Sequence, residues 1–200
     1  MFIYDLDLSS SEQLRIKKLC NKSCFIRSFK GDNYPDHVVE EKIKAYKPII
    51  IQEVLNEYGA IIWIEPPNVF VSNKSDLFLA KSQKNGLLAW PQAQPVSQMT
   101  HPTMFRYLNS KQRDYFFVHM LDTSQFIIYN NKEIHQKLML PWVKCALKAS
   151  CIAPPGSKYS GCNFTRRPFF RYSGCHRYEQ SAFSIIAALL YKFDESQYTT

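Results

Sequence analysis

Residues 60–68 read Ala-Ile-Ile-Trp-Ile-Glu-Pro-Pro-Asn, which is an apolar run followed by an acid and a proline turn. A short, continuous apolar run is typical of a strand that is covered on both faces. Gly59 directly before it predicts the end of a helix, and Pro48 suits the first turn of that helix because its missing N–H needs no partner there. The stretch therefore predicts a helix that leads into a buried strand, with Glu65 at the carboxyl end of the strand.

The residues before this helix predict two more strands and two more helices. Residues 2–6 form a short β-rich segment, and Ser9 followed by Glu12 has the spacing of a capping box, which predicts a helix over roughly residues 12–20. A second strand is expected over residues 24–29 and a charged helix over residues 36–46. This alternation implies parallel strands joined by crossovers, so the sequence predicts an α/β fold.

Ligands of open α/β sheets bind outside the carboxyl ends of the strands, which makes residues 65–68 the first candidate for a site. An ordinary proline turn is the alternative interpretation of the same residues.

The second half of the chain continues the alternation. Short strands are expected over residues 87–90 and 126–129, and a helix over residues 132–148, broken or kinked at Pro141. Residues 151–175 are rich in Pro, Gly, Ser and Cys, which predicts an irregular loop stapled by cysteines. Long loops in compact domains are usually functional, and this one leads into a final apolar helix.

Composition limits the classes of function. The chain has 200 residues, 46% of them hydrophobic, which suits a single domain over residues 1–200. Its 25 Lys and Arg against 17 Asp and Glu give a net charge of +8, so its surface attracts anions. The basic residues lie in scattered pairs without the long run or motif of a nucleic-acid binder, so nucleic acid is not an expected partner. No stretch reaches the ~18 to 20 apolar residues of a membrane span.

Cysteines and sequons indicate the compartment. Four of six cysteines cluster in one region, without the tight C-x-x-C pairs of a zinc site, so disulfides or buried thiols are expected there. The cluster consists of Cys145, Cys151, Cys162 and Cys175. Candidate glycosylation sequons begin at Asn21, Asn73 and Asn163. These features favour the secretory pathway, in the Golgi or outside the cell.

Several phrases of the sequence form a motif set that spans most of the chain. They are YDLxLS at 4–9, KPxII at 47–51, YGAxxW at 58–63, HPxM at 101–104, WVxCAL at 142–147, CIAPPGSK at 151–158, CNF at 162–164 and GCHRYxQS at 174–181. The set resembles an uncharacterised animal family of nucleotide-diphospho-sugar-transferase-like domains with the GT-A fold.

The resemblance implies a fold and a reaction. The fold would be a three-layer α/β/α domain with a mixed, mostly parallel central sheet, and the chain would be truncated so that the first strand of such domains is missing. The reaction would move a sugar from a nucleotide-diphosphate donor to a hydroxyl of a glycan or protein acceptor. A divalent cation, Mn²⁺ or Mg²⁺, would neutralise the diphosphate leaving group.

The resemblance also implies roles for particular residues. Glu65 would bind the metal and the diphosphate, and Glu179 would act as general base or orient the acceptor. His176 would contact the metal or a phosphate, Lys47 would offer a cation to the diphosphate, and Asp122 would line the nucleotide site. Each has a structural alternative: a solvated side chain for Glu65 and Lys47, a hydrogen bond at a helix start for His176, and a favourable helix dipole for Glu179.

Three departures from the family pattern weaken the expectation of catalysis. Glu65 replaces an aspartate and has no second carboxylate beside it, whereas a divalent cation needs several oxygens. Residues 122–124 (Asp-Thr-Ser) replace a glycine-rich turn, and Glu179 is one methylene longer than the expected aspartate. The alternative hypothesis is therefore a non-catalytic, degenerate GT-A fold that binds a glycan or a protein.

Overall fold

A computed structural model describes residues 1–20, 24–71 and 75–200. The strands are β1 (Phe2–Asp5), β2 (Phe25–Ser28), β3 (Ala60–Ile64), β4 (Leu87–Pro95) and β5 (His119–Tyr129). The α-helices are α1 (Ser10–Cys20), α2 (Tyr46–Tyr58), α3 (Asp76–Asn85), α4 (Val96–Met99), α5 (Pro102–Tyr107), α6 (Lys132–Ile134), α7 (Leu140–Ala146), α8 (Ala149–Ile152) and α9 (Tyr178–Leu190). Short 3₁₀ turns join several of these elements.

The fold is mixed α/β, as predicted, but its strands form two separate sheets. β1 and β2 pair in parallel, and the larger sheet has the order β3-β5-β4 with both pairings antiparallel. This corrects the expectation of a mostly parallel central sheet. The apolar run at 60–64 fixes a strand but not the direction of its partner, and β3 lies at an edge of the sheet with Ile62 48% exposed.

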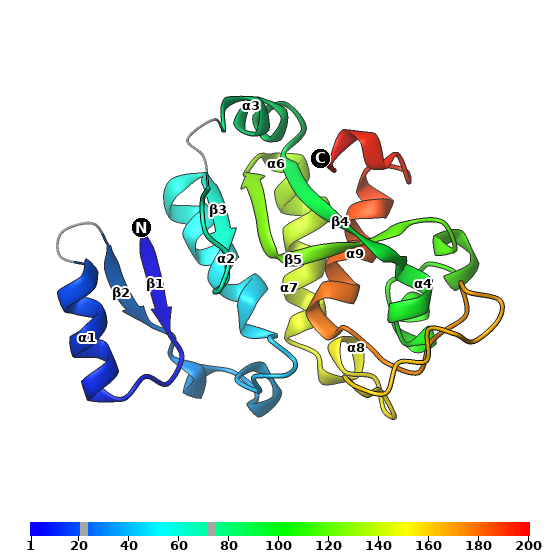
Figure 1. Ribbon diagram of the computed structural model, residues 1–200, viewed down its shortest axis with the longest axis horizontal. Helices are drawn as coiled ribbons and strands as arrows, with labels where there is room; N and C mark the ends of the chain where they lie inside the picture. Colours follow the sequence, from blue (N-terminus) through cyan, green and yellow to red (C-terminus); the bar gives the residue numbers. More distant parts are fainter. Residues whose placement is uncertain (21–23, 72–74) are drawn as a thin grey trace.

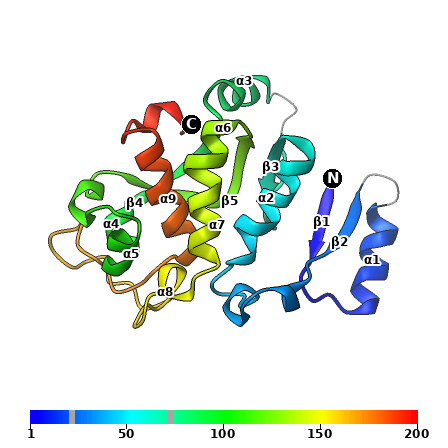
Figure 2. The same cartoon turned by 180° about the vertical axis from the view of Figure 1, so that it is seen from behind.

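The larger sheet carries a layer of helices on one face. α2, α7 and α9 lie side by side behind β3 and β5 in Figure 1, and they stand in front of these strands in the reverse view of Figure 2. The main core fills the space between the two layers. Trp142 of α7 lies at its centre, with its ring centroid 4.5 Å from that of Phe183 and 6.1 Å from that of Phe126.

The N-terminal unit of β1, α1 and β2 lies beside α2, at the left of Figure 1. The predicted capping box forms at the start of α1, where the hydroxyl and the N–H of Ser9 both donate to Glu12. Arg27 of β2 joins the unit to α2 through an ion pair of 2.7 Å with Glu57. Tyr4 and Phe29 also pack against the main core.

Local sequence signals place α2 correctly but not the segment before it. Gly59 ends α2 at a φ of 74°, and its N–H donates to the carbonyl of Leu55. The expectation of a charged helix over residues 36–46 is wrong, because the segment before α2 forms only a 3₁₀ turn at Asp36–Val38. Lys44 takes a left-handed backbone conformation, with a φ of 54°, which interrupts helical geometry just before α2 begins.

The helix expected over residues 132–148 forms with a local widening. A π-helical turn at His135–Met139 separates α6 from α7, and Pro141 follows immediately in the first turn of α7. Proline has no N–H to donate, and a wider turn accommodates its ring against the preceding carbonyl groups. The predicted distortion at Pro141 is therefore present as a π-turn.

Three disulfides pair all six cysteines. Cys145 pairs with Cys151 and Cys162 with Cys175, in the cluster where disulfides or buried thiols were expected without assigned partners, and Cys20 with Cys24 adds a pair that the sequence did not predict. Three disulfides fit an oxidising, secretory or extracellular environment.

Two other expectations from the sequence concern the glycosylation sequons and membrane-spanning helices among the described residues. The sequon residue Asn163 lies exposed, whereas Asn21 and Asn73 lie outside the described residues. In the described parts of the chain, no helix combines the length and apolarity that a membrane crossing requires.

Candidate functional site

The two carboxylates predicted for the site meet at one buried ammonium group. The Nζ atom of Lys47 lies 2.6 Å from Oε1 of Glu65 and 2.7 Å from Oε1 of Glu179. Nζ also donates to the carbonyl of Thr123 at 3.0 Å. The side chain of Lys47 is only 1% exposed, so these oxygens satisfy all three of its donor hydrogens inside the protein.

Four elements hold the site together. Lys47 lies in the first turn of α2 and Glu179 in the first turn of α9. Glu65 follows β3 directly, and its N–H donates to the carbonyl of Ser124 at 2.7 Å. The pairing of β5 with β4 jumps between Phe126 and Asp122, so residues 123–125 bulge from the ladder with β4, although Gln125 still pairs with Ile64 of β3. The bulge re-aims the backbone and turns Thr123 toward Lys47.

Glu65 is the carboxylate that solvent reaches. Its side chain is 19% exposed, and its second oxygen accepts from Nζ of Lys44 at 2.7 Å. Burial opposes ionisation of Glu65, but the charges of Lys47 and Lys44 outweigh it and lower the pKa of this carboxyl. Glu65 is therefore ionised, and it forms an ion pair with the partly exposed Lys44.

Glu179 is enclosed. The residue is 4% exposed, and burial raises the pKa of its carboxyl despite the neighbouring charge of Lys47. The hydroxyl of Thr123 donates to its Oε1 at 3.0 Å, and its backbone carbonyl accepts from Nε1 of Trp142 at 3.0 Å. Its Oε2 has no hydrogen-bond partner among the described residues. A role for Glu179 as a general base would require this enclosure to open and expose the carboxylate.

The residues at the site do not fit a divalent cation as they are arranged. The ammonium group of Lys47 occupies the space between the facing oxygens of Glu65 and Glu179, which a shared metal ion would need. Within the described ranges, no group of three or more His, Cys, Asp and Glu side chains converges as metal ligands would. A metal bound between the two carboxylates would have to displace Lys47.

His176 makes structural hydrogen bonds. Its Nδ1 accepts from the N–H of His101 at 3.1 Å, so its Nε2 carries the proton and donates to the carbonyl of Ile152 at 3.0 Å. Burial lowers the pKa of His176 to about 3, which keeps the ring neutral. Both ring nitrogens are thus engaged by the backbone, and a metal contact at His176 would break one of these bonds.

Asp122 lies near the site but does not touch Lys47. Its Oδ1 accepts from the N–H of Ser124 at 2.8 Å, which stabilises the turn of the bulge. The side-chain amide of Asn68 also contacts this turn, because it donates to the Ser124 hydroxyl at 2.8 Å. Asp122 therefore shapes the backbone that presents Thr123.

Sequence reasoning missed two members of the site. Lys44 lies in a segment predicted as helix, and nothing in the sequence distinguishes it from other surface lysines. Thr123 lies in the segment that departs from the family pattern, and the loss of a glycine-rich turn gave no indication that its side chain and carbonyl contact the site.

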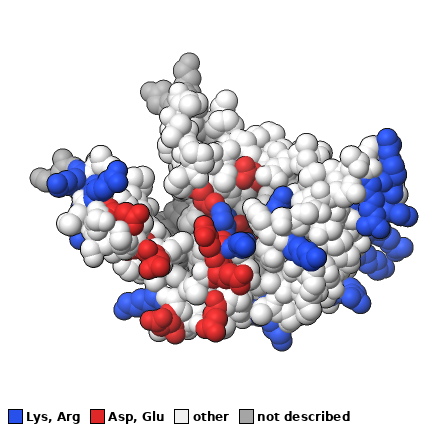
Figure 3. All heavy atoms as spheres, turned by 60° about the horizontal axis from the view of Figure 1, so that its bottom comes forward, with Lys and Arg blue, Asp and Glu red and all other residues white. Residues whose placement is uncertain are grey.

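One face of the molecule is mixed in charge. Figure 3 shows acidic side chains gathered in the middle of one face with a few basic side chains among them, while other basic side chains gather at the right-hand end.

Comparison of the chain with protein-family models, with curated proteins and with solved structures found no match.

Proposed function

We propose that this chain is a GT-A-like sugar-transfer domain of the secretory pathway, acting in the Golgi or beyond it. It moves a sugar from a nucleotide-diphosphate donor to a hydroxyl group of a glycan or protein acceptor. The observation that carries the proposal is the meeting of Glu65 and Glu179 at Lys47. These are the positions that the motif resemblance marks for the reaction, and they come from distant parts of the sequence.

The chemistry requires positive charge where the diphosphate departs. Lys44 supplies it, because its side chain is 37% exposed and is held at the carboxyl end of β3 by Glu65. Lys47 lies behind Glu65 and adds a fixed charge in a region of low dielectric. Preorganised charges of this kind stabilise a developing anion without reorganisation during the reaction.

The two carboxylates have different roles in this proposal. Glu65 stays ionised because its pKa is lowered, which suits a group that orients the acceptor hydroxyl, takes up its proton as the new bond to the sugar forms, and holds the Lys44 ammonium. Glu179 is a positioning residue, since it fixes Lys47 from the buried side and does not reach the solvent. Replacing it acts on the reaction only through Lys47.

Turnover of a panel of nucleotide-diphosphate sugars, with and without acceptor, tests this proposal. Glu65→Gln keeps the shape of the side chain but removes the charge that holds Lys44. We expect its turnover to fall by about 100-fold or more, as when a charge-stabilising group is removed from an enzyme site. Glu57→Gln is the matched control, because Glu57 pairs with Arg27 on the surface outside the site. Equal turnover by the wild-type protein and Glu65→Gln would contradict the proposal.

A non-catalytic binding module is the second candidate function. The observation in its favour is that the ammonium group of Lys47 fills the space between the two carboxylates. Thermal unfolding with uridine or guanosine diphosphate distinguishes the two candidates. A transferase gains about 2.7 kcal/mol of stability when the ligand is present at about 100 times its Kd. If neither nucleotide raises the melting temperature and no donor turns over, the binding module replaces the transferase.

A further inference from the structure

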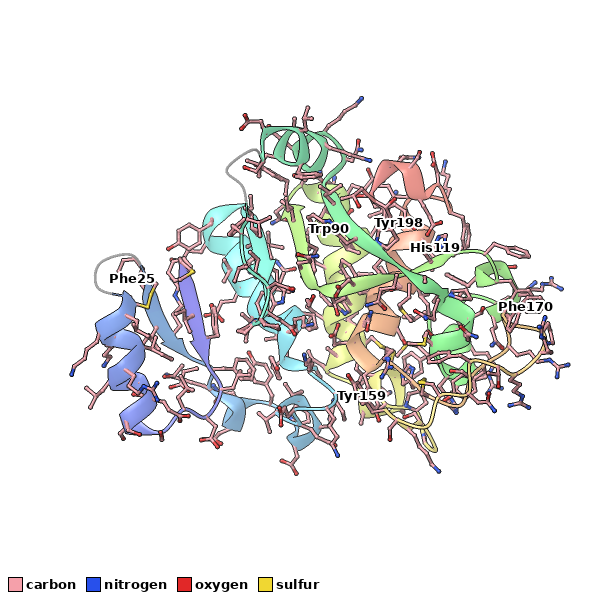
Figure 4. The ribbon with its side chains drawn as sticks, in the orientation of Figure 1. Phe25, Trp90, His119, Tyr159, Phe170 and Tyr198 are labelled. Carbon is pink, nitrogen blue, oxygen red and sulfur yellow. A yellow bond between two sulfur atoms is a disulfide. The ribbon has the colours of Figure 1, made fainter. Side chains whose placement is uncertain are left out.

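A groove of about 910 Å³ lies at the end of the molecule far from β1 and β2. Figure 4 labels Phe170 there, at the end opposite Phe25. Aromatic rings line much of the groove: Phe116 and Phe117 come from the segment before β5, and Phe169 and Phe170 from the disulfide-stapled loop. Phe117 is 85% exposed and Phe169 51% exposed, so part of each ring is open to a ligand.

Arginines border the same rings. Arg167 lines the groove, with its guanidinium 4.0 Å from the ring centroid of Phe169. A second hollow of about 340 Å³ shares Phe116 with the groove and is lined by Arg166 and Arg171. All three arginines are exposed, and none of them forms an ion pair with a described residue. Their charges are therefore available to an anionic ligand.

The sequence around this surface has few compensating acids. No Asp or Glu occurs between Glu133 and Glu179, a stretch that includes the whole loop. The exposed Asp114 precedes Phe116 in the chain, and its carboxylate lies 3.8 Å from the guanidinium of Arg113. Figure 3 shows basic side chains gathered at this end of the molecule.

The loop is rigidly anchored, although it contains little regular structure. The Cys162–Cys175 disulfide closes it, and the N–H and hydroxyl of Ser173 both donate to the carbonyl of Gln98. The hydroxyl of Ser97 donates to the carbonyl of Phe170 at 2.9 Å, and the ring of Phe170 stacks on Phe116 with centroids 4.2 Å apart. A surface fixed in this way loses little entropy when it binds a ligand.

We propose that this surface binds a sulfated glycan chain. Sulfate and carboxylate groups pair with the guanidinium groups of Arg166, Arg167 and Arg171, and the apolar faces of the sugar rings pack against the exposed phenylalanines. The three disulfides favour a glycan over nucleic acid, because they place the protein in a secretory or extracellular environment. This inference does not depend on sugar transfer at Glu65, since the groove and the Lys47 site have no residue in common.

Binding of a fluorescent heparin oligosaccharide to the intact chain tests this inference. The site variant combines Arg166→Ala, Arg167→Ala and Arg171→Ala, and we expect its Kd to rise at least about tenfold. The matched control combines Arg15→Ala, Lys17→Ala and Lys18→Ala on α1, which removes the same charge from exposed residues at the other end of the molecule. Its Kd should change by less than about twofold, because most of its charge lies beyond the screening length in physiological salt.

A third variant tests the aromatic contribution. Phe169→Ala leaves every charge in place, and we expect it to weaken heparin binding by about threefold or more, because the sugar loses its apolar platform. Equal losses in the site variant and the α1 control would overturn the inference in favour of nonspecific charge attraction. Tighter binding of single-stranded DNA than of heparin, or equal binding of desulfated heparin, would also overturn it. Donor turnover by the site variant is measured separately, so failure here is distinct from failure of the transferase proposal.

Discussion

Replacing Lys47 with Met should lower the free energy of unfolding by about 3 to 5 kcal/mol at about pH 7. Methionine fills the volume of the lysine stem but provides no charge. Glu65 and Glu179 would then face each other with no cation between them, and Glu179 would be a buried charge with only Thr123 as a donor to its carboxylate. Urea-induced unfolding, followed by circular dichroism, measures the loss.

The loss should depend on pH in a definite direction. Lys47 favours the ionised form of both carboxylates, so its removal raises both pKa values. Burial already raises the pKa of Glu179 in the folded protein, so without Lys47 this carboxyl binds its proton still more tightly than the glutamates of the unfolded chain, which titrate near about 4.3. The stability of the variant therefore increases as pH falls from about 7 toward about 4, and its deficit relative to the wild-type protein shrinks.

Lys44→Met provides the control for this prediction. Lys44 pairs with Glu65 at the same distance of 2.7 Å, but its side chain is 37% exposed and water replaces part of the interaction. We expect it to cost less than about 1 kcal/mol. Equal losses in Lys44→Met and Lys47→Met, or a Lys47→Met deficit that grows as pH falls, would contradict the structure of the site.

Replacing Trp142 with Ala should also lower the free energy of unfolding by about 3 to 5 kcal/mol, because it leaves a cavity in the core. The indole ring is 0% exposed and packs against both Phe126 of the sheet and Phe183 of α9. Its Nε1 also donates to the carbonyl of Glu179, so the substitution removes packing and one bond to the residue that carries the buried carboxylate. Thermal and urea unfolding of the variant measure the combined loss.

Two other substitutions separate these contributions. Trp142→Phe keeps an aromatic ring in the core and chiefly loses the hydrogen bond, for which we expect about 1 to 3 kcal/mol because the Glu179 carbonyl stays buried. Trp90→Ala removes a partly buried indole that contacts Phe78 outside the main core, and it should cost less than half as much as Trp142→Ala. A larger loss in Trp90→Ala than in Trp142→Ala would show that the core is centred elsewhere.

The sequence predicted local structure well where a single residue type dictates geometry. Gly59 ends α2, Ser9 and Glu12 cap α1, and Pro141 distorts a helix, because each effect depends on neighbouring backbone atoms alone. Strand pairing depends on residues far apart in the chain. The antiparallel pairing of β3 with β5 therefore could not be read from the apolar run at 60–64, which is compatible with either direction.

The sequence predicted which residues form the candidate site better than it predicted how they are arranged. Glu65, Glu179 and Lys47 were all named from motif positions, and the structure brings them together. Their roles changed because burial is a tertiary property: Lys47 is 1% exposed, although lysine is usually a surface residue. The segment that departs from the glycine-rich turn of the family pattern includes Thr123, which lies in the bulge and contacts Lys47.

The central claim is that Lys47 and Glu179 form one buried pair, and a double-mutant cycle measures that pair directly. The four proteins are the wild type, Lys47→Met, Glu179→Gln and the double variant, each unfolded in urea at about pH 7. Because the double variant has neither an unpaired ammonium nor an unpaired carboxylate between these positions, it should be more stable than the sum of the single losses predicts. We expect a coupling energy of about 1.5 to 3 kcal/mol. Additive losses, with coupling below about 0.5 kcal/mol, would show that Lys47 and Glu179 do not interact.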